Sequence, residues 1–234
     1  MIPIGDENRG RRGVPVVTVT LVAINVLVFL YQNTLTLEGL RSFILTYGAI
    51  PAEIEARQDL YTLFTSMFVH GGFAHIAGNM LFLWIFGDNI ERRFGPVLFL
   101  LFYLGCGLAA TGVHMLSAAG SQVPTVGASG AISGVMGAYT LLYPRNRVRV
   151  LIWYLGVMQV PAFIFLGIWF LTQFMTGVAT LDVQTAQSSG VAVWAHVGGF
   201  AAGVIAGGAL GVFRREPTRK QADLALWRDR EDRW

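Results

Sequence analysis

The chain has 234 residues, of which 54% are hydrophobic and only 13% are charged, and its formal net charge is +3. Soluble domains carry about 25% charged residues, so this composition indicates a membrane protein and excludes an ordinary soluble domain. The single cysteine, Cys106, excludes a fold held by internal disulfides, and we expect it to be a small apolar core residue.

Long uncharged stretches alternate with short charged segments along the chain, and a membrane-spanning helix needs about 20 apolar residues. The stretches without Lys, Arg, Asp or Glu are 13–37, 60–87, 96–144, 150–181 and 183–213. The third stretch is long enough for two spans. The sequence therefore predicts an all-α polytopic membrane protein with six transmembrane helices, over residues 15–32, 73–89, 97–117, 129–143, 148–176 and 192–213.

Basic residues gather on one side of this predicted bundle. Fifteen of the 17 Lys and Arg residues precede the first helix, separate helices two and three or four and five, or follow the last helix. The positive-inside rule places such segments in the cytoplasm. We therefore expect a cytoplasmic N-terminal tail at 1–14, a membrane domain at 15–213 and a charged cytoplasmic C-terminal tail at 214–234. The basic segments face anionic lipid, so the net charge requires no nucleic-acid partner.

Polar residues occur at the start of three predicted helices that run in the same direction. These residues are His75 and Asn79 in the second helix, Ser129 in the fourth and His196 in the sixth. Polar side chains are costly to hold in lipid and often mark functional sites. Because the second, fourth and sixth helices all begin on the outer side, the polar residues arrive at a similar depth.

A stripe of small residues predicts which of these helices touch. The sixth helix has glycine at every fourth position from Gly199 onward, and the fourth helix has Gly130 and Gly134 at the same interval. Small residues at this spacing let two backbones approach closely in lipid. His196 precedes Gly199 by three positions and projects from the striped face, so this packing brings its imidazole toward Ser129.

A serine hydroxyl beside a histidine indicates nucleophilic catalysis, because a neutral imidazole can take the hydroxyl proton near pH 7. The nearest acid on the outer side, Asp182, lies in a loop. We therefore predict a Ser129–His196 dyad without a third member, its ring held by packing. The expected oxyanion donors are the Ser129 backbone N–H, at the start of a helix, and the side chains of His75 and Asn79.

Each of these residues also has an ordinary structural interpretation. A serine at a helix start often serves as a cap, a histidine in a span often bonds to a neighbouring helix, and Asn79 alone could join two helices. The histidines could bind a metal, but no carboxylate or thiolate accompanies them, so we expect no metal and no cofactor. Convergence at one depth favours the catalytic interpretation.

Four motifs, taken together and in order, resemble a known family. They are HGGxxHxxGN at 70–79, ERRFG at 91–95, GASG at 127–130 and AHxxGxxxG at 195–203. Each motif alone is weakly specific, but the set resembles the rhomboid family of intramembrane serine proteases over about residues 15–213.

The resemblance implies a serine endopeptidase that cleaves transmembrane segments of single-span membrane proteins near their extracytoplasmic end. It implies that Ser129 is the nucleophile, that His196 is the general base, and that His75, Asn79 and the Ser129 amide form the oxyanion hole. The implied surroundings are the lipid bilayer, and we expect a bacterial cytoplasmic membrane. The natural substrate and the oligomeric state stay open.

The resemblance also implies structures around the site. Residues 33–72 match a long first loop that lies partly in the membrane, and the fifth helix with the loop 177–191 matches a lateral gate and cap. Trp169, Phe170 and Phe174 either line that gate or face lipid.

One position departs from the family pattern. Many members carry an aromatic residue four positions after the nucleophile, where it packs on the catalytic imidazole, but this chain has Ser133 there. The ring of His196 is then held by another side chain or more loosely.

Two other functions remain open at this point. One is an inactive rhomboid-like protein that binds membrane clients without cutting them, although such proteins typically lack the serine or the histidine. The other is a small transporter or channel, but neither a carboxylate nor an arginine within a span nor an inverted repeat supports it. Labelling by a fluorophosphonate that depends on Ser129 would favour the protease over both.

Overall fold

The computed structural model describes residues 1–7, 13–179 and 192–213, and the structural findings concern these ranges. The main helices of the bundle are α1 (Val16–Gln32), α5 (Phe73–Phe82), α6 (Asp88–Phe94), α7 (Pro96–Ser117), α8 (Ser129–Leu142), α9 (Ala162–Ala179) and α10 (Val193–Phe213). Shorter elements are α2 (Leu37–Tyr47), α3 (Pro51–Glu55), α4 (Thr62–Thr65), a 3-10 turn η1 (Ser66–Phe68) and a π-helical turn η2 (Leu83–Gly87). The strands are β1 (Ile2–Asp6), β2 (Arg147–Ile152) and β3 (Gly156–Pro161).

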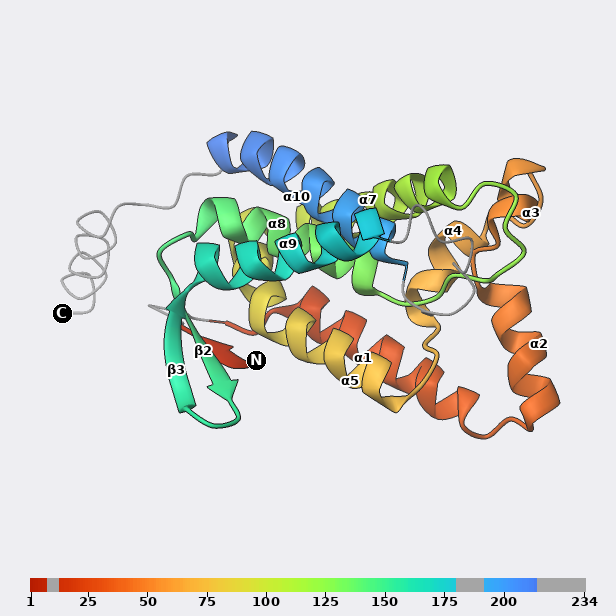
Figure 1. Ribbon diagram of the computed structural model, residues 1–234, viewed down its shortest axis with the longest axis horizontal. Coiled ribbons are helices and arrows are strands. Elements are labelled where there is room, and N and C mark those ends of the chain that lie inside the picture. Colours follow the sequence, from red (N-terminus) through yellow and green to blue (C-terminus); the bar gives the residue numbers. More distant parts are fainter. Residues whose placement is uncertain (8–12, 180–191, 214–234) are drawn as a thin grey trace, which may run out of the picture.

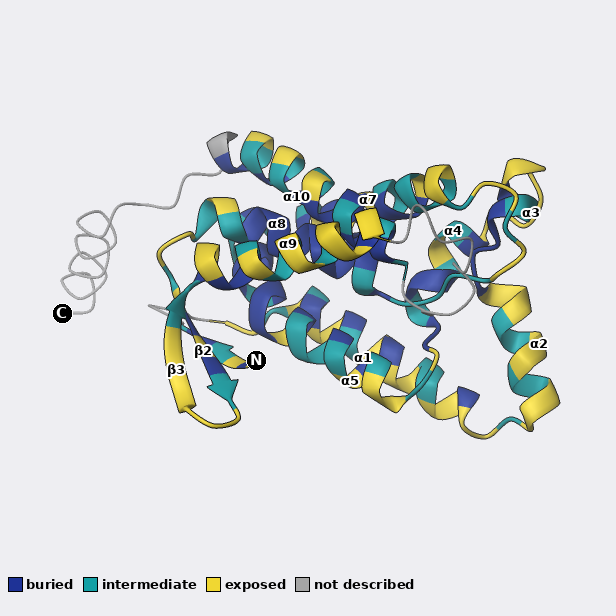
Figure 2. Cartoon of the chain, in the orientation of Figure 1, coloured by how far each residue is buried: buried dark blue, intermediate teal, exposed yellow. Residues whose placement is uncertain are grey.

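Helix α8 lies at the centre of the bundle, with α10 and α7 packed against it and α9 in front (Figure 1). All of its residues from Gly130 to Tyr139 are buried, whereas α9 and α10 show exposed outer faces (Figure 2). A helix of only 14 residues can be buried this fully because small side chains let its neighbours come close. Helix α8, which begins at Ser129, is therefore the most fully buried of the described helices.

The glycine stripe packs α10 against α8, as the sequence predicts. A Cβ atom built on Gly199 would collide with the backbone oxygen of Gly130, and one on Gly203 would collide with the backbone oxygen of Gly134. Such contacts leave room for glycine alone and join the two helices backbone to backbone.

The predicted count of six spans is not confirmed by helix length. Within the described ranges, α7, α9 and α10 are long and apolar enough to cross a membrane, and a bent pair, 62–68 with 73–94, makes a fourth if it counts as one span. Helices α1 and α8 are apolar but have only 17 and 14 residues. The ranges predicted for α1, α7, α8 and α10 agree with the structure to within one residue. The chain is mostly helical, and six crossings remain an expectation.

The helix expected over 148–176 is wrong in its first part, and the all-α class is corrected with it. Strands β2 and β3 form an antiparallel hairpin there, β1 adds to β2, and the sheet order is β1-β2-β3. Arginine and valine alternate from Arg147 to Val150, a period of two that suits a strand with one buried face. The long uncharged stretch after 150 favours a single membrane helix and so hides this short strand pattern. Helix α9 begins only at Ala162.

The small sheet lies at one end of the molecule, and α2, α3 and α4 lie at the opposite end (Figure 1). Residues 2–6 of the expected N-terminal tail thus form a strand, while the elements of the expected first loop, 33–72, gather at the other end. The predicted orientation, in which Arg147 and Arg149 face the cytoplasm, stays a prediction. The expected tail at 214–234 and most of the expected cap loop, 180–191, fall outside the described residues.

Glu91, from the ERRFG motif, ties α6 to the start of α1. Its carboxylate accepts hydrogen bonds from the backbone N–H of Val17 at 2.9 Å and of Thr18 at 2.7 Å, and from the Thr18 hydroxyl at 2.7 Å. The first turn of a helix has N–H groups without intrahelical acceptors and favours negative charge. Glu91, which is buried, therefore stabilises the junction between the first two parts of the bundle.

Candidate active site

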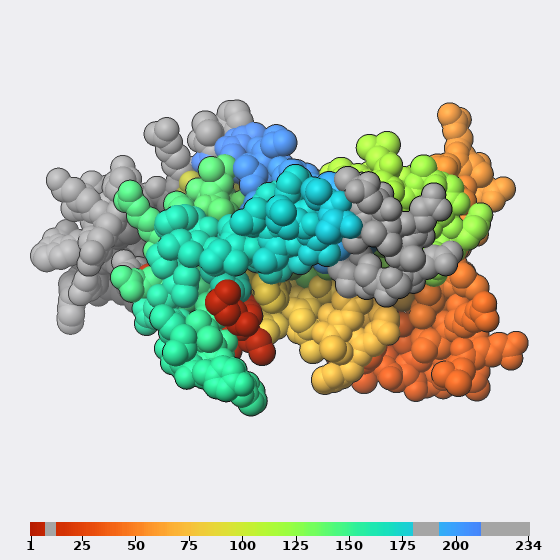
Figure 3. Space-filling model, in the orientation of Figure 1, coloured from red at the N-terminus to blue at the C-terminus, as the bar shows by residue number. Residues whose placement is uncertain are grey.

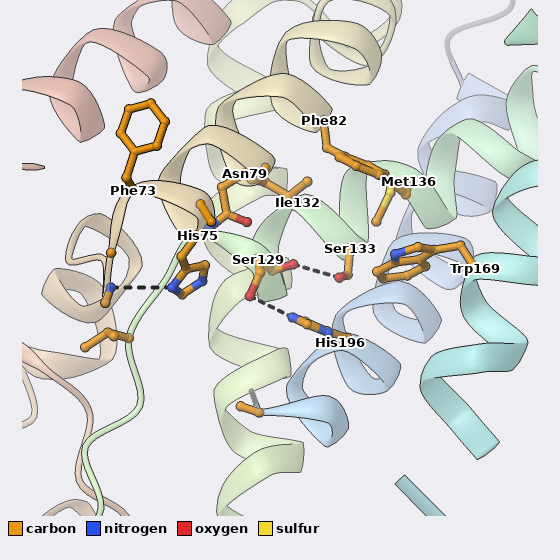
Figure 4. A pocket seen from close by; sticks show the side chains of 16 residues that line it. Phe73, His75, Asn79, Phe82, Ser129, Ile132, Ser133, Met136, Trp169 and His196 are labelled. Atoms are coloured by element: carbon orange, nitrogen blue, oxygen red, sulfur yellow. Dashed lines mark hydrogen bonds between the residues drawn. The ribbon is translucent and has the colours of Figure 1, made fainter. Parts of the chain in front are cut away.

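Ser129 and His196 lie in hydrogen-bond contact, as the packing of their helices predicts. The distance from His196 Nε2 to Ser129 Oγ is 2.8 Å (Figure 4). Ser129 is the first residue of α8 and His196 lies in the first turn of α10, just before the glycines that join the two helices. The serine is half-buried and the imidazole is buried, so the pair lies inside the bundle with one side open to a cavity.

The cavity beside this pair has a volume of about 820 Å³ and is formed by α5, α8, α9, α10 and the loop before α5. Its polar end holds both predicted oxyanion donors, His75 and Asn79, together with Ser129 and His196. Its other walls are apolar and include Phe82, Ile132, Met136 and Trp169 (Figure 4). A concave site with an apolar wall and few convergent polar groups is the usual form of a binding site.

His75 and Asn79 lie on one face of α5, four residues apart, and point into the cavity. The Gly127 backbone passes so close to His75 that a Cβ atom there would lie 2.7 Å from the imidazole, and Gly127 has a φ of 123°. Glycine is the residue that accepts both this conformation and this approach. The GASG motif thus lets the chain before Ser129 run directly beside the proposed donors.

His70, the first histidine of the HGGxxHxxGN motif, lies in hydrogen-bond contact with the side chain of Asn79. The Asn79 Nδ2 atom lies 2.9 Å from His70 Nε2. The Gln32 side chain in turn donates to the His70 carbonyl at 2.9 Å and accepts from its N–H at 3.1 Å. The amide of Asn79 is therefore fixed by a chain of hydrogen bonds that reaches back to α1.

The imidazole of His196 is held from α9. The Trp169 ring lies 5.9 Å from the imidazole centroid, and Gln173 Oε1 lies 2.8 Å from His196 Nδ1. Ser133, which stands where the resemblance to the family implies an aromatic residue, donates to the backbone oxygen of Ser129 at 2.7 Å. Sequence analysis missed Gln173. The feature that could have indicated Gln173 is a long amide side chain in a mostly apolar stretch.

Other polar and aromatic residues of the bundle lie in structural contacts. His114 of α7 lies 2.8 Å from the Thr125 hydroxyl, outside the cavity lining, and Cys106 is buried and unpaired. Phe170 stacks on Phe200 of α10. Within the described ranges, no group of three or more His, Cys, Asp or Glu side chains is arranged to hold a metal ion. Asp182 lies outside the described residues, as do the other polar residues of the expected cap loop, Gln184, Gln187, Ser188 and Ser189.

Comparison with known proteins shows which family the chain belongs to. Residues 57–213 match the model of the Rhomboid domain. The chain belongs to the Rhomboid family. A Bacillus subtilis relative, Rhomboid protease GluP, is 31% identical over 202 residues, which is 86% of this chain and 36% of the relative.

Two mitochondrial relatives are similar to this chain over a shorter stretch. RHOMBOID-like protein 12 of Arabidopsis thaliana is 32% identical over 163 residues, or 63% of this chain and 45% of the relative. The human presenilin-associated rhomboid-like protein is 32% identical over 137 residues, or 57% of this chain and 35% of the relative. The chain thus spans less than half the length of these relatives. Rhomboid membership fits the apolar helices and identifies a membrane protein whose relatives include a protease.

Proposed function

We propose that this rhomboid is an intramembrane serine endopeptidase in which Ser129 is the nucleophile and His196 the general base. The observation that carries the proposal is the 2.8 Å contact between His196 Nε2 and Ser129 Oγ at the polar end of the cavity. A hydroxyl within hydrogen-bond reach of an imidazole is the arrangement that activates a serine nucleophile. Membership of the family and a relative named as a protease support the same reaction.

In the proposed reaction, His196 Nε2 takes the proton of the Ser129 hydroxyl while Oγ attacks the carbonyl carbon of the substrate. The tetrahedral intermediate collapses with cleavage of the C–N bond, and His196 gives its proton to the leaving amine. Water then hydrolyses the acyl ester, with His196 again as the base. No step requires a metal or a cofactor.

The oxyanion of that intermediate is proposed to lie between α5 and the start of α8. The Ser129 N–H has no intrahelical acceptor before it, and the helix dipole favours negative charge there. Asn79 and His75 supply side-chain donors from the opposite wall of the cavity. Donors fixed before the reaction stabilise developing charge without reorganisation.

Replacing Asn79 with alanine is expected to lower kcat about 100- to 1000-fold, because one oxyanion donor contributes about that much. KM should change little, since the donor acts mainly on the transition state. The measurement is steady-state cleavage of a reporter substrate in proteoliposomes. Asn33→Ala is the matched control, because the Asn33 amide is exposed and bonds to its own helix at Phe29 O. Equal losses in the two variants would contradict the assignment.

The substrate is proposed to be the transmembrane segment of a single-span protein, cut near its extracytoplasmic end. The helices that carry Ser129, His196 and His75 all begin on the same side, so the reacting groups lie near that surface. Helices α5 and α9 lie next to each other on one face of the molecule (Figure 3). Phe82 of α5 stacks on Phe165 of α9 at 6.5 Å, which makes this aromatic seam the proposed path from the lipid to the cavity.

The proposed setting is a bacterial cytoplasmic membrane with both termini in the cytoplasm. The basic residues around β2 and the expected tails support this orientation. The bilayer and the substrate segment are the proposed partners, with no nucleic acid among them.

The test is a proteoliposome assay with a generic single-span substrate, together with fluorophosphonate labelling. Wild-type protein is expected to cleave the substrate near its outer end and to label at Ser129, and Ser129→Ala is expected to do neither. Binding of the substrate without cleavage or labelling would favour an inactive family member. Solute flux through the liposomes without cleavage would favour a transporter.

A further inference from the structure

Two side chains from one face of α9 contact the imidazole of His196. Trp169 and Gln173 are four residues apart, which places them on the same side of the helix. Gln173 is half-buried in a mostly apolar helix, where an unpaired amide would be costly. The contact with His196 gives this amide its partner.

The two ring nitrogens of His196 have one partner each, on opposite sides. Nε2 lies 2.8 Å from Ser129 Oγ, and Nδ1 lies 2.8 Å from Gln173 Oε1. Since an amide oxygen only accepts, Nδ1 carries the proton in this arrangement and the lone pair of Nε2 faces the serine hydroxyl. That is the tautomer in which the imidazole can act as a base toward Ser129.

We propose that Gln173 is a positioning residue for the Ser129–His196 pair. Its amide oxygen accepts the Nδ1–H of His196 and so fixes both the tautomer and the direction of the ring. The inference rests on the proposed function and adds a third partner to a site that the sequence predicts to have two members. Helix α8 gives the ring no comparable support, because the Ser133 hydroxyl bonds to the backbone of its own helix.

The role of Gln173 continues through the reaction. When Nε2 takes the serine proton, the imidazolium has two N–H donors, and Nδ1–H keeps its acceptor while Nε2–H turns to the leaving amine. An amide oxygen does not take the proton, so the charge stays on the ring until the amine leaves. A hydrogen bond to a charged donor is stronger than one to a neutral donor, and its loss corresponds to about a 10- to 50-fold fall in rate.

The placement on α9 has a structural consequence. The same helix forms one side of the proposed path from the lipid, where Phe165 meets Phe82. Trp169 and Gln173 lie four and eight residues after Phe165 on the same helix. A displacement of α9 away from α10 would therefore remove both contacts to His196, which links the path for substrate to the alignment of the base.

The test measures kcat and KM for a single-span substrate in proteoliposomes between pH 5 and 9. Gln173→Leu, which removes the acceptor but keeps much of the volume, is expected to lower kcat about 10- to 50-fold with little change in KM. Gln173→Glu keeps an acceptor and is expected to recover much of the lost kcat. Its acid limb should lie at higher pH, because a carboxylate stabilises the protonated imidazole. The other histidines of this part of the bundle, His75 of α5 and His114 of α7, are the same in all variants.

Thr172→Val is the matched control on the neighbouring position of α9. Thr172 is exposed, and its hydroxyl bonds to Trp169 O in its own helix, so wild-type kinetics are expected. Wild-type kcat and an unchanged pH profile in Gln173→Leu would overturn the inference, as would equal losses in Gln173→Leu and Thr172→Val. If Gln173→Leu does not fold, the pH profile of Gln173→Glu still decides, because an unmoved acid limb excludes contact with the ring.

Failure of this inference can be told apart from failure of the proposed function. If the wild type neither cleaves nor labels with a fluorophosphonate, the proposed function is wrong. If the wild type does both and Gln173→Leu equals it, only the role of Gln173 is wrong.

Discussion

Replacing His196 with alanine is expected to abolish substrate cleavage, with kcat reduced by about 10³-fold or more. Without the imidazole no group takes the Ser129 proton, and in serine proteases the loss of the histidine alone costs nearly as much as the loss of the whole catalytic set. Fluorophosphonate labelling should fall with it, although Ser129 is intact. The measurement is single-turnover cleavage and labelling in proteoliposomes.

His114→Ala is the matched control for this prediction. His114 contacts Thr125 and does not line the cavity, so its removal should leave most of the cleavage rate. The wild-type rate should also decrease in acid as His196 takes a proton in the free enzyme. A rate that stays flat through the whole acid range in which the protein stays folded, while chemistry limits turnover, would contradict a histidine base.

The contact between Ser129 and His196 could be predicted because it depends on two patterns that repeat along the chain, the basic clusters and the glycine spacing. The clustering of basic residues predicts the direction of each helix, and the glycine spacing in α8 and α10 predicts the face on which they touch. Close contact between Gly203 and the Gly134 backbone then leaves little freedom in the position of the imidazole. Local pattern and tertiary contact agree here, so the sequence is sufficient.

The contribution of α9 could not be predicted in the same way. The helix is apolar on all sides, so no periodicity shows which face turns toward the bundle. The hairpin before it also moved its start to Ala162, and the pairing of β1 with β2 joins segments more than 140 residues apart. Pairings so distant in sequence leave no signal in a local window.

Ser133 shows how the missing support for the imidazole was replaced. The sequence indicates that the usual aromatic residue is absent from α8, and the structure has the Trp169 indole next to His196 instead. Ser133 and Trp169 line the same cavity (Figure 4). The ring contact of His196 thus comes from α9, which only the fold could reveal.

Gly203→Val is expected to destabilise the protein by about 3 kcal/mol or more, because overpacking of a tight contact typically costs 1–3 kcal/mol and a backbone atom cannot move aside as a side chain can. The new side chain would collide with the Gly134 backbone and force α10 away from α8. Thermal unfolding in detergent measures the loss. Since a misplacement of about 1 Å can cost 100-fold in rate, the surviving folded fraction should also cleave substrate about 100-fold more slowly.

Gly105→Val separates this effect from the general effect of valine in a membrane helix. Gly105 lies on an exposed face of α7, and a Cβ atom there meets no atom of another described element within 4 Å. Its replacement should change neither Tm nor kcat appreciably. Equal stability of the two variants would show that α8 and α10 are not joined through their backbones. The Ser129–His196 contact would then need another cause, because it depends on the close approach of Gly199 and Gly203 to the backbone of α8.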